Sequence, residues 1–400
     1  METQSASAAI VREKTQQAVG ILEEMGIDLW LTFVRETPQV KDPMVDLLAG
    51  IELTWISALL IHRDGRRLAI AGRFDVANLE RLRAYDRVIG YDQSFQEPLV
   101  STIRALKPGR IAVNYSESDP AADGLTYGMF RLLSRTLAAT PYASRLVSAE
   151  PVIAALRGRK TPTEVALVKA AIDCTEEAIG QLQKNIRPGV SDVEVAALLH
   201  QYVDDQGYTT GWDADYCPVV TVGPDSVYGH GMPAGLRAEA GKLVHIDFGI
   251  TRYGYTSDLQ RTWYLREPQE SSLPEDIQHA WKAVTHALET GRAALKPGAK
   301  GWEVDAAARS ALMEAGYPEF MHAFGHHIGR TAHDGSTILG PKWERYGTAI
   351  EGVVEENNVF AIELGAKVEG RGYVSREENV IVTANGAQYL SQPQDELWLI

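Results

Sequence analysis

The sequence predicts an α/β (α+β) fold in two domains, and three observations support this. Short apolar runs alternate with helix-like stretches over the first 150 residues, a helix-start signal follows near residue 161, and one segment of the second half recurs at an offset of 109 residues. We expect the domain boundary at 155/156, which gives domains of 1–155 and 156–400. A chain of 400 residues is long enough for each domain to have its own core.

The first domain is predicted from four apolar runs. They lie at 28–33, 54–62, 66–72 and 110–115 and are rich in leucine or β-branched residues, with helix-like stretches between them. The polar residues of this part form no recognisable chemical cluster. We therefore expect a supporting or oligomerisation domain.

A helix signal opens the second domain. In the segment Thr161-Pro162-Thr163-Glu164, a threonine N-cap, a proline at the first helical position and a glutamate at the third form a capping box. This pattern predicts the start of a long helix.

The second domain also contains an internal repeat. The segments RPGVSDVEVAALLHQYVDDQGY (187–208) and KPGAKGWEVDAAARSALMEAGY (296–317) align without gaps, and each reads as a helix that stops at a glycine. The strand-like segments HIDFG (245–249) and AIELG (361–365) also correspond. Two equivalent α/β halves predict a pseudo-twofold domain, and we expect its site to lie between them.

Composition and charge exclude several classes of protein. The 39 Lys and Arg residues against 53 Asp and Glu residues give a formal net charge of -14, which disfavours binding to nucleic acid or to an anionic membrane. No segment approaches the ~20 uninterrupted apolar residues of a membrane helix, and the first residues lack a signal-peptide pattern. We therefore expect a cytoplasmic protein with neither partner. Cys174 and Cys217 are expected to be buried small residues rather than a disulfide.

Four acidic residues interrupt otherwise apolar, strand-like segments. Asp247 and Asp258 flank the turn-like TRYGYTS, and a hairpin centred near residues 252–253 would place them directly opposite each other. Glu363 and Glu377 flank a second turn in the same way. One such carboxylate is usually a turn or edge residue. Four at repeat-related positions, each costly to bury unless paired or metal-bound, have the composition of a dinuclear divalent-metal site.

The segment MHAFGHHIGRTAHDG (321–335) contains four of the ten histidines. An imidazole would complete the coordination of such a site, and the glycines around His326 permit close approach of the backbone. The spacing differs from HExxH, which excludes a zincin helix. We interpret His245 as structural, on the sheet face opposite Asp247. The other histidines interpreted as structural are His62, His200, His279, His286 and His327.

Together these segments resemble metallopeptidase family M24, the pita-bread fold of methionine aminopeptidases, Xaa-Pro aminopeptidases, prolidases and creatinase. The resemblance covers roughly residues 155–400, and the N-terminal part resembles the creatinase-type domain of the Xaa-Pro and creatinase branch. It implies five metal ligands in the family's order, with the second aspartate and the last glutamate bridging two metal ions. The implied ligands are Asp247, Asp258, His326, Glu363 and Glu377.

The resemblance also implies the chemistry. Two divalent ions, expected to be Mn²⁺ with Co²⁺, Fe²⁺ and Zn²⁺ as alternatives, would be bridged by a hydroxide that attacks the scissile carbonyl. Glu363 would accept the proton of the attacking water, as a catalytic residue as well as a ligand. His230, His322 and His333 match histidines that hydrogen-bond the substrate and the tetrahedral intermediate in the Xaa-Pro branch.

The implied function is an Xaa-Pro dipeptidase or aminopeptidase that cleaves short peptides and forms a homodimer. Two departures leave the need for proline open. Ala323 follows His322 where the branch usually has a glycine. Ser375 stands where an arginine is common, with Arg376 one position later. The alternatives are a repurposed pita-bread enzyme, a lyase or C–N hydrolase acting on another small molecule, and a non-catalytic binding module that would purify without stoichiometric metal.

Overall fold

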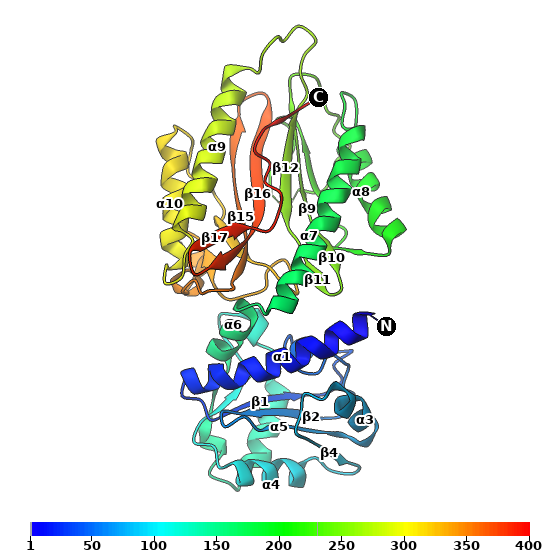
Figure 1. Cartoon of the computed structure of the whole chain (residues 1–400), viewed down its shortest axis with the longest axis vertical. Coiled ribbons are helices and arrows are strands. Elements are labelled where there is room, and N and C mark those ends of the chain that lie inside the picture. Colours follow the sequence, from blue (N-terminus) through cyan, green and yellow to red (C-terminus); the bar gives the residue numbers. More distant parts are fainter. Residues whose placement is uncertain (1, 230) are drawn as a thin grey trace. The chain divides into compact units, whose positions relative to one another are not determined.

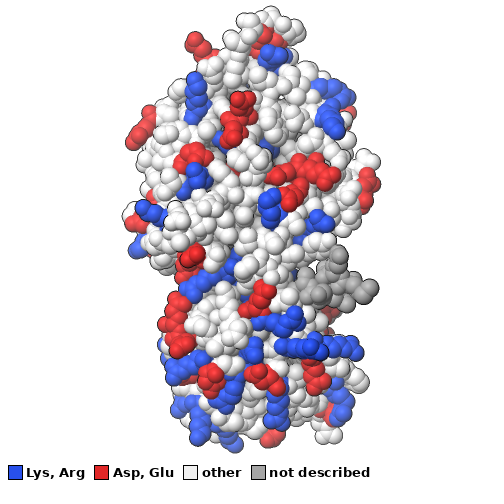
Figure 2. All heavy atoms as spheres, in the orientation of Figure 1, with Lys and Arg blue, Asp and Glu red and all other residues white. Residues whose placement is uncertain are grey.

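The computed structural model describes residues 2–229 and 231–400 and divides into two compact units, Met1–Arg157 and Gly158–Ile400 (Figure 1). Among the described residues, no helix is both long and apolar enough to cross a membrane. Figure 2 shows acidic and basic side chains interspersed on the face of each unit that it views. The negative net charge is therefore not gathered into one patch on that face.

The first unit is built on a six-stranded sheet in the order β4-β3-β2-β1-β5-β6. Strand β1 is antiparallel to β2 and parallel to β5. The strands are β1 (Leu29–Val34), β2 (Ser57–His62), β3 (Arg67–Gly72), β4 (Arg87–Tyr91), β5 (Ile111–Val113) and β6 (Leu146–Ser148). The four predicted runs thus became β1, β2, β3 and β5. Strands β4 and β6 were not predicted, because β4 is largely solvent-accessible and β6 has only three residues.

Helices cover this sheet, and Figure 1 shows α1 and α4 on different sides of it. The helices are α1 (Glu2–Glu24), α2 (Val45–Leu48), α3 (Arg73–Leu82), α4 (Gln96–Leu106), α5 (Tyr127–Leu137) and α6 (Glu150–Gly158). Apolar side chains of α4 and α5, including Leu99 and Leu133, pack with Leu29, Leu31 and Phe33 of β1 into one buried core. This burial of apolar surface is what holds the helices to the sheet.

The second unit begins with α7 (Pro162–Leu182), and the predicted capping box is present. The Thr161 hydroxyl accepts the backbone N–H of Glu164 at 3.3 Å, and the Glu164 carboxylate accepts that of Thr161 at 2.8 Å. Two of the orphan N–H groups of the helix start are satisfied in this way.

The internal repeat corresponds to equivalent helices, α8 (Asp192–Gln206) and α10 (Gly301–Glu314). The two helices begin with the same side-chain hydrogen bond. The Glu194 carboxylate accepts the backbone N–H of Ser191 in α8, and the Glu303 carboxylate accepts the backbone N–H of Lys300 in α10, both at 2.8 Å. Each helix is followed by a glycine with positive φ, at positions 207 and 316. Helix α9 (Glu275–Ala294) packs against α10 and the sheet, as Figure 1 shows.

The second unit contains a nine-stranded sheet. Seven of its strands follow the order β14-β13-β15-β16-β12-β9-β8, while β17 pairs with β16 and β18 pairs with β12. A smaller sheet has the order β11-β10-β7. The strands are β7 (Thr209–Thr210), β8 (Val219–Val222), β9 (Leu243–Phe248), β10 (Ile250–Arg252), β11 (Tyr255–Thr256), β12 (Leu259–Tyr264), β13 (Gly325–His327), β14 (Ile338–Leu339), β15 (Val359–Val368), β16 (Gly372–Thr383), β17 (Gly386–Tyr389) and β18 (Trp398–Leu399). The fold is the predicted mixed α/β architecture.

Candidate metal centre

A row of polar side chains crosses the middle of the large sheet. Asp247 on β9 is the register partner of Gln260 on β12. Gln260 is in turn the partner of Glu377 on β16, which is the partner of Glu363 on β15. Directly paired residues of antiparallel strands point to the same sheet face. Three carboxylates and one carboxamide therefore line one face, side by side across four strands.

The predicted pairing of Asp247 with Asp258 is wrong by register. The hairpin turn is Tyr253-Gly254, both with positive φ, and Arg252 pairs with Tyr255. Two-residue turns with positive φ at both positions suit the twist of a hairpin, and they place its centre one residue later than predicted. Asp247 therefore faces Gln260, and Asp258, two residues earlier than Gln260, is a diagonal neighbour of Asp247 on the same face.

Strand β13 brings His326 to this face. His326 is the register partner of Ala361 on β15, and its Nε2 lies 3.8 Å from Asp258 Oδ2 and 4.0 Å from Glu377 Oε1. Ligand atoms of these three side chains all lie within 4.8 Å of one another. The neighbouring Gly325 permits the close approach, because a Cβ there would lie 2.3 Å from the Ala361 carbonyl oxygen.

The chemistry of these side chains fits divalent metal ions. Burial raises the pKa of Asp247 to about 7, and burial with the charge of Asp247 raises that of Glu363 to about 8. The pKa values of Asp258 and Glu377 are raised well above normal, first by burial and then by the neighbouring carboxylates. Buried oxygens of three of these residues find no hydrogen-bond donor among the described residues: Asp247 Oδ1, Asp258 Oδ1 and Glu377 Oε2. Crowded, unsatisfied carboxylates are stable together when cations lie between them.

His326 is suited to the same role. Burial, together with the nearby His333, lowers the pKa of His326 to about 3, so its imidazole is neutral. Neutral imidazole is the form that binds a metal. The five implied ligands therefore supply four carboxylates and one neutral imidazole on one face of the sheet.

The other predicted site histidines lie around this cluster. The His333 ring is 4.4 Å from the His326 ring, edge to face. His322 lies beside the carboxylates and lines a pocket of about 70 Å³ that also includes Asp247 and Glu363. His230 lies outside the described residues. His327 points away and packs against Phe360, with 4.1 Å between the ring centroids and 32° between the ring planes, as expected of a structural histidine.

Two residues of the site were missed by the sequence analysis. His245 was assigned to the face opposite Asp247, and this is wrong because residues two apart on a strand share a face. The His245 ring lines the same small pocket and lies 2.9 Å from Gln260 Oε1. Gln260 is the second such residue, and it follows Asp258 by two positions. The signal for both was spacing, since each lies two residues from a predicted ligand on the same chain segment.

Arg376 does not substitute for the arginine that the resemblance leads one to expect at Ser375. Arg376 donates from Nη1 to Thr285 Oγ1 of α9 at 3.1 Å and lies over the ring of Trp281. These contacts are on the sheet face opposite Glu377, because successive residues of a strand alternate between faces. Ser375 lies on the Glu377 face, so the site has a hydroxyl there.

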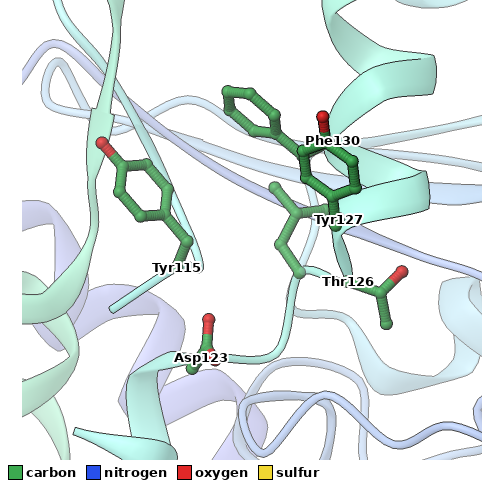
Figure 3. A pocket seen from close by; sticks show the side chains of 6 residues that line it. Tyr115, Asp123, Thr126, Tyr127 and Phe130 are labelled. Carbon is green, nitrogen blue, oxygen red and sulfur yellow. The ribbon is translucent and has the colours of Figure 1, made fainter. Parts of the chain in front are cut away.

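The first unit has a larger pocket that lacks comparable chemistry. Its volume is about 550 Å³, and Figure 3 shows its lining. Among the lining residues Asp123 is the one acid, and its Oδ1 accepts the backbone N–H of Ser116 at 3.3 Å. The rings of Tyr115 and Phe130 meet edge to face at 6.0 Å. The carboxylate and histidine cluster of the second unit is therefore the candidate functional site.

Comparison with known proteins identifies the family. A model of metallopeptidase family M24 matches residues 166–384, more than half of the chain. The chain belongs to metallopeptidase family M24. The match includes all five implied ligands of this M24 peptidase, and the family implies the use of divalent metal.

Individual proteins that are similar to this chain in sequence or structure support the same family assignment. The M24 peptidase is 30% identical to the Xaa-Pro dipeptidase of Pyrococcus furiosus over 249 residues, 62% of this chain and 67% of the relative. Its structure resembles that of the Xaa-Pro dipeptidase from Bacillus anthracis with a TM-score of 0.74 and 25% identity, over 98% of this chain and 100% of the other. The X-Pro aminopeptidase structure from Thermotoga maritima, at 24% identity, has the same fold with a TM-score of 0.70 over 96% and 99% of the two chains. The M24 peptidase thus has the pita-bread fold with an N-terminal domain.

Proposed function

We propose that this M24 peptidase cleaves Xaa-Pro bonds of short peptides as a dipeptidase or aminopeptidase with two divalent metal ions, Mn²⁺ first among them. The observation that carries the proposal is the convergence of four carboxylates, two buried and two half-buried, and a neutral imidazole on one sheet face. Three of the carboxylates have an oxygen that finds no donor among the described residues. The residues that would hold the ions are Asp247, Asp258, His326, Glu363 and Glu377.

Bound metal ions would supply Lewis-acid charge and lower the pKa of a water molecule at the site. Glu363 is the group that we assign to accept a proton from that water, because its carboxylate lines the small pocket beside the ligand cluster. His322 lines the small pocket next to Asp247 and Glu363, and the His333 ring lies against the His326 ring. We assign them to hydrogen-bond the substrate.

The substrate pocket that we propose adjoins the carboxylates. A pocket of about 490 Å³ shares Tyr228 and His322 with the small pocket beside Glu363. The rings of Tyr228 and Tyr373 stack with 4.5 Å between their centroids, and the ring centroids of Phe320 and His322 are 5.4 Å apart. Such an aromatic lining suits a proline ring or another apolar residue next to the scissile bond.

The test is hydrolysis of a small peptide panel by metal-free protein titrated with Mn²⁺. The panel contains Ala-Pro, Gly-Pro, Met-Ala and Ala-Pro-Ala. We expect Mn²⁺-dependent cleavage of the Xaa-Pro bonds and none of Met-Ala. Cleavage of Met-Ala at the same rate would contradict proline specificity, and bound metal without cleavage of any peptide would contradict a peptide substrate.

A further inference from the structure

Gln260 is the centre of a buried hydrogen-bond network beside the carboxylates. Its Nε2 lies 2.7 Å from Glu363 Oε2. Its Oε1 lies 2.5 Å from Ser375 Oγ and 2.9 Å from His245 Nε2. Beyond these, Tyr228 Oη is 2.8 Å from Ser375 Oγ, and Thr221 Oγ1 is 3.5 Å from His245 Nδ1.

Chemistry determines the direction of each bond in this network. As a metal ligand Glu363 would be ionised, and an ionised carboxylate only accepts, so the NH₂ group of Gln260 faces Glu363 and its carbonyl oxygen faces Ser375. That oxygen also only accepts, so the Ser375 hydroxyl and His245 Nε2 both donate to it. The Ser375 oxygen is then left to accept from Tyr228.

The remaining bond follows in the same way. Because His245 is protonated on Nε2 in the neutral ring, its Nδ1 accepts from the Thr221 hydroxyl. All donors thus point toward the Gln260 oxygen, and the Gln260 amide points toward Glu363. Reversing the Gln260 amide or the His245 tautomer would break a bond to the next member, whereas the Ser375 hydroxyl has a second, longer acceptor in the Leu364 carbonyl oxygen at 3.2 Å.

The network is buried, so its bonds are costly to leave unmade. The exposed fraction is 2% for Gln260, 0% for Ser375 and 2% for His245. A buried donor or acceptor that loses its partner incurs a desolvation penalty of about 1–3 kcal/mol. The favoured arrangement therefore keeps the bond from Gln260 to Glu363 Oε2 and leaves the other oxygen of Glu363 to a metal.

We propose that Gln260 is a positioning residue of the metal centre, which fixes the Glu363 carboxylate through this one-way network. The proposal rests on the proposed role of Glu363 as a ligand. It also gives the Ser375 departure a physical reason: a small hydroxyl at this position donates to Gln260 Oε1 and leaves the space that the carboxamide fills. The orientation of Glu363 is then set by neutral groups instead of an arginine.

The test measures Mn²⁺ binding to the metal-free full-length protein by isothermal titration calorimetry. Gln260→Met keeps the side-chain length and removes both polar groups. We expect its Mn²⁺ affinity to fall by about ten-fold to a hundred-fold, as for other groups that orient a metal ligand. In separate peptidase kinetics, we expect a larger change in kcat than in KM. Gln388→Met, the same change at an exposed position of β17, should bind Mn²⁺ like the wild type.

A second variant separates positioning from a general structural role. Ser375→Ala removes one donor to Gln260 Oε1, and we expect a several-fold weaker Mn²⁺ affinity. If Ser375 acts through Gln260, adding Ser375→Ala to Gln260→Met should cause no further loss. Independent structural damage would instead add in the double variant.

The outcomes distinguish this proposal from the proposed function, because the calorimetry needs no peptide. Wild-type Mn²⁺ affinity in Gln260→Met would overturn the positioning role whatever the peptidase does. If that variant does not fold, wild-type affinity in Ser375→Ala would overturn the role in the same way. Weakened affinity in both variants would support the role even if no Xaa-Pro peptide is cleaved.

Discussion

Lys160 Nζ lies 2.9 Å from Asp334 Oδ2, and both side chains are buried, with exposed fractions of 0% and 2%. The pair joins the segment before α7 to the loop that carries His333. Gly329 lies against it, since a Cβ there would be 2.0 Å from Asp334 Oδ2 and 2.5 Å from Lys160 Cε. The ion pair therefore holds a predicted substrate-binding loop in place.

Removing one partner of this pair should strongly destabilise the protein. In Lys160→Met the Asp334 carboxylate loses its buried cation, and we expect a loss of about 3–5 kcal/mol in the free energy of unfolding. Urea unfolding followed by circular dichroism measures the loss. Lys169→Met is the matched control, because Lys169 pairs with Asp173 on the exposed surface and such pairs contribute about 0–1 kcal/mol. Equal midpoints for the two variants would show that the buried pair is not stabilising.

Asp258→Ala should abolish metal binding and peptidase activity while the fold is kept. Asp258 Oδ2 lies 3.8 Å from His326 Nε2, and its second carboxylate oxygen finds no donor among the described residues, so the carboxylate is suited to a bound cation. Elemental analysis of purified protein gives the metal content. Asp204→Ala, at an exposed position of α8, should keep both properties. Wild-type metal stoichiometry in Asp258→Ala would refute the assignment of this ligand.

His333→Ala should keep the metal and lose turnover. The His333 ring borders His326 but is exposed, as expected of a group that meets the substrate instead of the metal. We expect kcat to fall by more than about 10²-fold, comparable to the loss of an oxyanion donor. Steady-state kinetics on a cleaved peptide, with metal content measured in parallel, tests this. His286→Ala on the exposed side of α9 is the control, and near-normal turnover in His333→Ala would assign His333 a structural role only.

Metal binding should release protons in the neutral range. In the metal-free protein burial raises the pKa of Asp247 from 3.8 to about 7 and that of Glu363 from 4.5 to about 8. Both groups are therefore largely protonated at about pH 6, and a metal ion must displace these protons. Calorimetry at this pH in buffers of different ionisation enthalpy measures the release, which should shrink at about pH 9. A heat of binding independent of the buffer at the lower pH would contradict the raised pKa values.

The same shifts determine how the stability of the metal-free protein depends on pH. Folded-state pKa values above the unfolded ones mean that the folded state keeps these protons longer. The contribution of Asp247 and Glu363 to stability is then full below about pH 4 and falls as the pH rises through about 7 and 8. Thermal unfolding of the metal-free protein across this range should show the decline, and saturating Mn²⁺ should reduce it. A melting temperature that rises with pH in the metal-free protein would contradict this sign.

Local signals in the sequence were sufficient for much of the fold. The capping box at Thr161 and Glu164 predicted the start of α7, because a cap depends on residues three apart. The repeat predicted equivalent helices, and these became α8 and α10. The sequence alone also singled out four acids and His326 as a group, because carboxylates in apolar strands are costly without a partner.

Tertiary structure decided which side chains meet. A one-residue shift of the turn to Tyr253-Gly254 made Gln260 the partner of Asp247, a difference of turn conformation that the sequence analysis placed one position too early. Glu377 and Arg376, adjacent in sequence, face opposite sides of the sheet because strand side chains alternate. The network from Tyr228 and Thr221 to Glu363 joins segments that are distant in the chain. By itself the sequence determined the start of α7, the repeat and the kinds of ligand present. Only strand register decided how the ligands are arranged, because pairing between distant segments depends on the packing of the whole sheet.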